Sequence, residues 1–496
     1  MYKSLISIIK KHIDLLFIAL GLSLALSLSL YYLGNKSLFL DEVGSFTITQ
    51  NWTHMQSIFR NSEGNMWFYY ILLYFWTRLG TSEIILRSLS AIFAIATIIP
   101  LFYLTKHIFG NRTARISMIL FPINIFFVKN AQFARGYSLL ILLTTISSYL
   151  FLLYVHTSKK RYLLLYIILS VLSVYTHLFA LFVIASQLFS LMFLQNKKSW
   201  KYFAVAYALI LVLIIPIFIS PSIHSQQINW IMKPTLIYFV GIYAILSGDF
   251  LPTTLISSLL ILWYLYSIWN HGKFKSIIND YNFKFVVISF LLPCIASFIF
   301  SLTVKPILVL EYLVICLVPF ILLLSAAFDT IYGTRLFKII LVLFILFSII
   351  RLHGWYSEDQ RFAVAIPNNT ENWKTAAQLV SNYAKNNDAY LVLPTYSLSC
   401  FNYYYNQENL NTKVTELKLI INNSSIEVIS NNHISPLSTI FQKYKRIWYM
   451  QDVVAGVGYN KMESDINKLL NKKYTLMSGV KFFRLTVYLY ELKKNK

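Results

Sequence analysis

Acidic side chains are rare in the apolar part of the chain, and two of them are adjacent. Only nine Asp or Glu residues stand before position 351, and Asp41 and Glu42 follow the first apolar run directly, with Glu63 later in the same polar stretch. A carboxylate at a membrane surface can act as a general base toward a hydroxyl group. The alternative is an acidic loop at a helix end, and position alone does not decide between these two interpretations. Nor does it show whether Asp41 or Glu42 would be the base.

Two basic residues lie in loops that we place outside the cytoplasm, where Lys and Arg are usually rare. Arg135 lies in the segment Ala-Gln-Phe-Ala-Arg-Gly-Tyr at 131–137, and Lys305 lies at the boundary of a later apolar run. The planar guanidinium group binds phosphate through two parallel hydrogen bonds, which makes Arg135 a candidate phosphate ligand. The alternative is an arginine whose charged end reaches the membrane surface while its stem stays in hydrocarbon.

His177 and Glu311 complete the set of candidate site residues. His177 separates two apolar runs, and Glu311 opens another. A histidine in such a place is more often a hydrogen-bonded core residue than a metal ligand, and both interpretations stay open. Ionisable groups at membrane depth are costly, which favours a functional role for Glu311.

Composition identifies the class of protein that must position these residues. Of 496 residues, 57% are hydrophobic and 13% charged, against about 25% charged in soluble proteins. This excludes a disordered chain and an ordinary soluble enzyme. The net charge of +23 would suggest a nucleic-acid partner in a soluble protein. Here it indicates loop residues that orient helices and contact the lipid bilayer, so we predict no nucleic acid as partner.

The apolar runs predict a mainly α-helical, polytopic membrane bundle of about eleven spans. The runs lie near 13–33, 84–105, 116–128, 137–155, 162–176, 178–194, 202–220, 253–270, 285–303, 308–328 and 336–353. The distribution of Lys and Arg places the N-terminus in the cytoplasm and the candidate site residues outside. The aromatic patch Met66–Trp76 is too short to span, so we expect an interfacial helix there, and another in an outer loop at 235–247.

Residues 354–496 are polar and predict a C-terminal extracytoplasmic α/β domain, following a transmembrane domain at 1–353 whose first outer loop is 34–83. Expected elements are a helix at Glu371–Lys385, strands at Ala389–Leu393, Arg446–Met450 and Phe482–Tyr490, and a helix at Ser464–Leu470.

Several segments together resemble the C-superfamily of integral membrane glycosyltransferases. They are the acidic pair at 41–42, Glu-Gly-Asn-Met-Trp-Phe-Tyr-Tyr-Ile-Leu-Leu at 63–73, Gln-Phe-Ala-Arg-Gly-Tyr-Ser-Leu at 132–139 and Thr-His-Leu-Phe-Ala-Leu at 176–181. The branch that looks nearest is the bacterial protein-mannosyltransferase-like group, which includes the lipid A aminoarabinose transferases.

The resemblance implies an inverting transfer of a sugar from a polyprenyl-phosphate donor, on the outer face of the bacterial inner membrane, to a glycan, lipid or protein acceptor. It makes Asp41 the catalytic residue, places Arg135 near the donor phosphate, and gives Glu63 a role toward metal or acceptor. His177 and Glu311 join Glu63 as candidates for that role, and a divalent metal ion is left open. Many relatives have Arg-Tyr where this chain has Glu311-Tyr312, so Lys305 is the expected replacement for the missing cation.

Two alternatives remain from the sequence. One is a lipid-sugar flippase or transporter, although the repeats and midplane charges typical of transporters are not evident. The other is a catalytically inactive relative, which the glutamate at position 311 suggests.

Overall fold

The computed structural model describes residues 2–61, 65–194, 200–219, 230–270, 279–365, 371–408, 415–422, 425–430, 433–436, 443–452 and 459–493. The chain divides into two compact units. The first, here called the membrane unit, contains residues 1–33 and 48–368. The second, called the C-terminal unit, contains residues 369–496 together with the distant segment 34–47.

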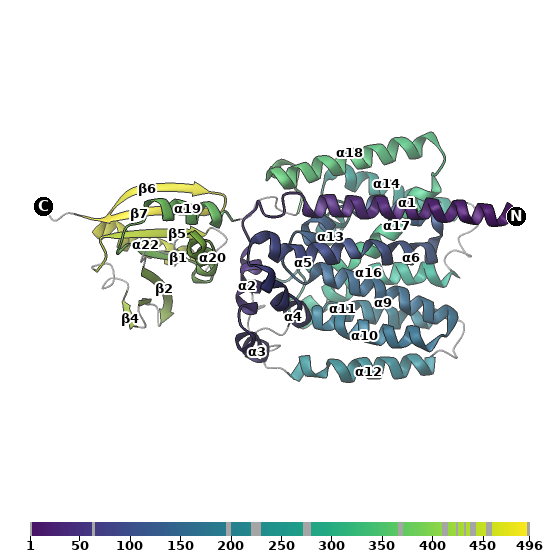
Figure 1. Ribbon diagram of the computed structural model, residues 1–496, viewed down its shortest axis with the longest axis horizontal. Helices are drawn as coiled ribbons and strands as arrows, with labels where there is room; N and C mark the ends of the chain where they lie inside the picture. Colours follow the sequence, from purple (N-terminus) through teal and green to yellow (C-terminus); the bar gives the residue numbers. More distant parts are fainter. Residues whose placement is uncertain are drawn as a thin grey trace. The chain divides into compact units, whose positions relative to one another are not determined.

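The membrane unit is built from helices, and its long helices run roughly parallel or antiparallel to one another (Figure 1). The helices are α1 (Tyr2–Leu30), α3 (Trp52–Asn61), α4 (Trp67–Trp76), α5 (Glu83–Ala96), α6 (Ile98–Phe109), α7 (Asn111–Leu120), α8 (Ile125–Ala131), α9 (Tyr137–Thr157), α10 (Lys160–Thr176), α11 (Ala180–Ser190), α12 (Trp200–Ile219), α13 (Ile237–Leu246), α14 (Leu251–Asn270), α16 (Tyr281–Thr303), α17 (Leu317–Thr330) and α18 (Arg335–Ser357). Short 3-10 helices include η1 (Thr77–Leu79), η2 (Leu191–Phe193), η6 (Leu310–Cys316) and η7 (Gln360–Phe362).

These helices confirm the predicted polytopic helical membrane protein. In the described residues, eight helices are long and apolar enough to cross a bilayer, or nine if the bent pair α7 and α8 forms one span. The predicted count was higher because the runs at 162–176 and 178–194 fold into the shorter helices α10 and α11. A straight crossing takes about 20 residues, which neither of these two helices reaches.

The aromatic patch folds as the short helix α4, ten residues long. Its Tyr69, Tyr70 and Leu73 side chains are buried, while Phe75 is exposed. One face of the helix therefore packs on the membrane unit and the other remains apolar and open, as expected for a helix at an interface.

Several charged residues that are buried in the membrane unit form ion pairs. Asp14 accepts hydrogen bonds from Lys106 at 2.9 Å and from Arg115 at 2.8 Å. Arg351 and Asp249 are both fully buried and meet at 2.6 Å. An unpaired charge in such a place would be strongly destabilising, so these residues hold helices together. The Arg351 pair accounts for Asp249, one of the rare acids of the apolar part.

The C-terminal unit is a mixed α/β domain, which confirms that prediction. Its sheet has the strand order β4-β3-β2-β1-β5-β7-β6, in which β1 pairs parallel with β2 and β5 and the remaining pairs are antiparallel. The strands are β1 (Ala389–Leu393), β2 (Thr415–Asn422), β3 (Ser425–Ser430), β4 (His433–Pro436), β5 (Arg446–Asp452), β6 (Tyr474–Phe482) and β7 (Leu485–Leu492). The helices are α19 (Trp373–Tyr383), α20 (Leu398–Glu408) and α22 (Tyr459–Lys473), with the short η8 (Thr395–Ser397).

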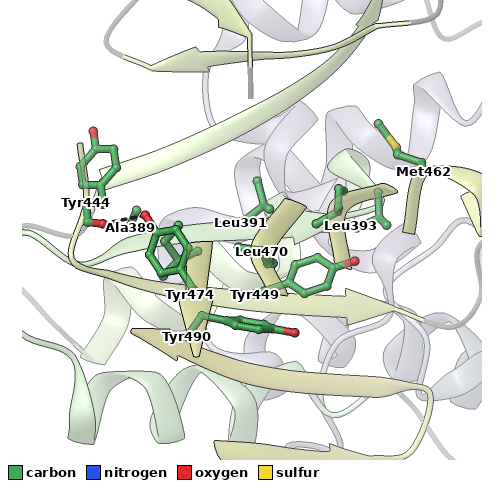
Figure 2. Packing of buried hydrophobic residues seen from close by; sticks show 11 residues of the cluster. Ala389, Leu391, Leu393, Tyr444, Tyr449, Met462, Leu470, Tyr474 and Tyr490 are labelled. Carbon is green, nitrogen blue, oxygen red and sulfur yellow. Dashed lines mark hydrogen bonds between the residues drawn. The ribbon is translucent and has the colours of Figure 1, made fainter. Parts of the chain in front are cut away.

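The core of this unit lies between the central strands and α22. Every residue of β1 is buried, as the uninterrupted apolar sequence of that strand requires. Leu391 and Leu393 of β1, Tyr449 of β5 and Leu470 of α22 belong to one buried cluster (Figure 2).

Candidate functional site

The end of α8 and the turn that leads to α9 carry two candidate cations. Asn124 begins α8 by accepting a hydrogen bond from the Phe126 N–H, and all seven residues of the helix are buried. Lys129 lies in its last turn, and Arg135 lies in the turn that follows. Gln132 anchors this turn, because its amide donates to the carbonyl of Tyr31 at 2.7 Å and its oxygen accepts from the Trp355 indole at 2.9 Å.

Close backbone packing requires a glycine directly after Arg135. A Cβ atom added at Gly136 would lie 3.2 Å from the Cβ of Tyr69 and 3.3 Å from Cγ2 of Thr176. The turn therefore presses against α4 and the end of α10. A side chain at this position would push the turn, and Arg135 with it, away from both helices.

Arg135 is held at both its backbone and its side chain. Its carbonyl accepts a hydrogen bond from Ser90 Oγ at 3.2 Å, and its Nη1 donates to the Tyr70 hydroxyl at 2.8 Å. The side chain is half-buried. A guanidinium group fixed in this way loses little further conformational freedom when it binds an anion.

Lys129 forms an ion pair with Glu311, which lies 182 residues later in the chain. The Nζ to Oε1 distance is 3.0 Å; the lysine side chain is 9% exposed and the glutamate side chain 35%. Lys129 is a residue that our sequence analysis missed. The available signal was a lysine directly after the apolar run 116–128, six residues before Arg135. Glu311 is thus the partner of a cation, which the sequence alone could not show.

His177 follows the last residue of α10, and its ring lies among aromatic rings of the membrane unit. It is 1% exposed, and its ring lies 4.8 Å from the Tyr312 ring and 5.7 Å from the Tyr137 ring. Its Nδ1 accepts from the Phe179 N–H at 3.1 Å, which places the proton on Nε2.

The electrostatic surroundings keep His177 neutral. Burial, with a smaller contribution from the charge of Arg135, lowers the pKa of His177 to about 3. Its Nε2 has no hydrogen-bond partner in the described residues. A neutral histidine can donate one hydrogen bond to an oxygen ligand without adding a positive charge.

Lys305 follows the end of α16 and is half-buried. Its side chain forms no ion pair with any carboxylate in the described part of the chain. The predicted proximity of Lys305 to Arg135 stays a prediction. Glu63 lies outside the described residues. Within those residues there is no group of three or more His, Cys, Asp or Glu side chains that could hold a metal ion.

The two adjacent carboxylates occupy different environments in the C-terminal unit. Both stand in the first turn of α2 (Leu40–Thr49). Glu42 is fully buried, and its Oε2 accepts a hydrogen bond from the Phe39 N–H at 2.9 Å. This is the reciprocal half of a capping box, in which a side chain reaches back to the residue before the helix. Asp41 is exposed, so only one carboxylate of the pair is open to a substrate.

Comparison with known proteins identifies the fold. No protein-family model and no curated protein sequence matches the chain. Among solved structures, ArnT from Cupriavidus metallidurans bound to undecaprenyl phosphate matches with a TM-score of 0.58 and 11% identity, over 95% of this chain and 97% of that chain. The Archaeoglobus fulgidus oligosaccharyltransferase tethered with an acceptor peptide matches with a TM-score of 0.55 and 12% identity, over 98% of this chain and 75% of that chain.

A third match is the arabinofuranosyltransferase AftD from Mycobacteria, with a TM-score of 0.50, 12% identity, and coverage of 96% of this chain and 40% of that chain. The chain therefore shares its fold with these solved membrane proteins. Identities near 11% show the fold alone, and the narrower aminoarabinose-transferase-like branch stays a prediction.

Proposed function

We propose that this protein is a glycosyltransferase that takes a sugar from a polyprenyl-phosphate carrier and transfers it to an acceptor hydroxyl on the outer face of the bacterial inner membrane. The observation that carries the proposal is the pair of cations, Lys129 and Arg135, on one buried helix and turn of this fold. The match to a structure bound to undecaprenyl phosphate supports the same donor class.

Donor binding is assigned to the membrane unit. Arg135 binds phosphate oxygens through its guanidinium group. Lys129 supplies a second positive charge, which Glu311 neutralises in the absence of ligand. The donor phosphodiester takes the place of the Glu311 carboxylate at Lys129. The two groups carry equal charge at first, but the phosphate gains a second negative charge as its bond to the sugar breaks, and Lys129 then binds it more strongly. Lys305 is the third cation of the proposal.

Acceptor activation is assigned to Asp41. The carboxylate takes the proton from the acceptor hydroxyl as its oxygen bonds to the anomeric carbon. The bond from that carbon to the phosphate oxygen breaks, and the polyprenyl phosphate leaves with the bonding electrons. Arg135 and Lys129 stabilise the charge that grows on the phosphate. A single displacement of this kind inverts the anomeric centre.

The test is consumption of undecaprenyl-phosphate-linked sugars by the purified full-length protein in lipid nanodiscs. We expect Arg135→Gln to weaken donor affinity and transfer by roughly 10-fold or more, because it removes a charge-assisted pair of hydrogen bonds. Arg78→Gln is the matched control, since Arg78 is exposed and stacks on Tyr74. Its transfer rate should equal that of the wild type.

Two outcomes would contradict the proposal. Movement of the intact lipid-linked sugar across the membrane of proteoliposomes, without its consumption, would identify a flippase. Binding of the donor without transfer to glycan, lipid or peptide acceptors would identify an inactive relative.

A further inference from the structure

The segment that bears Asp41 folds with the C-terminal unit, although residues 48–368 separate the two parts in sequence. Between them, residues 34–47 and 369–496 form one compact unit, distinct from the membrane unit. The segment is largely buried there: Leu38 is fully buried and Ser37 is 4% exposed. A buried backbone needs hydrogen-bond partners, and the C-terminal unit supplies them.

The first partner is a tyrosine of α20. The Leu38 N–H donates to the Tyr404 hydroxyl at 2.7 Å in a buried hydrogen bond. Leu38 stands directly before Phe39, whose N–H is bonded by Glu42. The Tyr404 hydroxyl therefore fixes the backbone at the entrance to α2, three residues before Asp41.

The second partner is the first turn of α19. The Lys374 N–H donates to Ser37 Oγ at 3.0 Å. The first N–H groups of a helix have no partner within that helix, so Ser37 satisfies one of them as it fixes the segment. A third contact lies beyond Asp41, where the Phe46 ring meets the Tyr403 ring edge-to-face at 5.3 Å.

Asp41 is thus bracketed by contacts on both sides, at positions 37, 38 and 46, all from helices of the C-terminal unit. The charge of Asp41 also contributes to the electrostatic environment of Glu371, just before α19, and of Cys400 on α20. The carboxylate itself stays exposed while its backbone is anchored.

We infer that the C-terminal unit positions the reactive carboxylate, and that Tyr404 is a positioning residue that acts on Asp41 through the Leu38 N–H. This inference rests on the proposed function, in which Asp41 is the base. It gives the C-terminal unit a role in the chemical step of transfer, because small displacements of a reacting group lower the rate strongly.

The test compares Tyr404→Phe with wild type in the full-length protein. The variant keeps the ring and removes only the hydroxyl that accepts from Leu38. We expect kcat to fall by roughly 10- to 100-fold while the affinity for undecaprenyl phosphate changes by less than about twofold. Amide hydrogen exchange of the peptide covering 34–47 should accelerate in the same variant.

Ser37→Ala should act in the same direction, and Ser37→Thr, which restores a hydroxyl, should recover the wild-type rate.

Tyr390→Phe is the matched control. It removes a tyrosine hydroxyl that donates to Asn402 of α20 at 3.1 Å. That hydrogen bond does not involve residues 34–47. The control should leave kcat and exchange in 34–47 unchanged.

Unchanged exchange in Tyr404→Phe would overturn the inferred anchoring. Faster exchange with unchanged kcat would overturn the positioning role. Absence of transfer by the wild-type protein would instead overturn the proposed function, and the exchange measurement would still decide whether Tyr404 holds the segment.

Discussion

Neighbouring carboxylates in this chain have opposite environments. Glu42 is buried and bonded to the Phe39 N–H, whereas Asp41 is exposed one residue earlier. The sequence presents the two as equivalent. The separation arises from helix geometry, because successive side chains of a helix point about 100° apart, so one can be buried while its neighbour is exposed.

A third carboxylate gives the C-terminal unit a distinctive pH dependence. Burial first, then the negative charges of Asp452 and Asp41, raise the pKa of Glu371 to about 7, while Arg484 opposes the shift. The folded pKa lies above the unfolded value near 4.5. Its contribution to stability is therefore fully present below about pH 4.5 and is lost as pH rises through about 7.

We predict that Glu371→Gln removes this part of the pH dependence. Between about pH 5 and about pH 8 the wild-type unit should lose stability on the order of 2 kcal/mol more than the variant does. Hydrogen exchange of the β1 and β5 amides at the two pH values measures the difference. Parallel losses in both proteins would show that Glu371 ionises normally.

The turn from α8 to α9 sets the position of Arg135. Gly136 allows the turn to touch α4 and α10. We predict that Gly136→Ala weakens donor binding and destabilises the membrane unit by about 1–3 kcal/mol, since the neighbours must move to admit a methyl group.

Gly241→Ala provides the control for that prediction. Its added Cβ would lie 3.5 Å from Leu310, an ordinary contact distance. Thermal unfolding and undecaprenyl-phosphate binding should therefore stay near wild type. Equal behaviour of the two variants would contradict the packing role of Gly136.

Individual elements were predictable where a local pattern specifies them. The apolar runs predicted the long helices, and the strand Ala389–Leu393 was predicted with its observed bounds. The ion pair of Lys129 with Glu311 was not predictable, because its partners are 182 residues apart and neither carries a local signal for the other. Glu311 was read as the loss of a cation, whereas the structure shows it beside one.

The two compact units of the molecule are not two consecutive stretches of the sequence. Composition changes near residue 354, yet the structure groups residues 34–47 with the C-terminal unit. No single-sequence pattern reveals this grouping, since it depends on contacts such as Leu38 with Tyr404. The grouping connects the first polar loop to the last domain.

We predict that the C-terminal unit lies outside the cytoplasm, as the distribution of basic loops indicates. Ser464→Cys on α22 should react with a membrane-impermeant maleimide in intact cells, whereas Lys159→Cys should react only after permeabilisation; both positions are exposed. The natural cysteines at 294, 316 and 400 are buried, which keeps the background low. The reverse labelling pattern would show that the C-terminal unit lies in the cytoplasm.

We propose that Asp41 activates the acceptor while the membrane unit binds a polyprenyl-phosphate sugar. Native mass spectrometry of the Asp41→Asn protein with donor and acceptor tests it most directly, because one spectrum resolves bound donor from released polyprenyl phosphate. We predict that the variant binds intact donor and releases product lipid at least roughly 100-fold more slowly than wild type. Glu42→Gln should turn over donor faster than Asp41→Asn. Release of product lipid by Asp41→Asn at the wild-type rate would show that Asp41 is not the base.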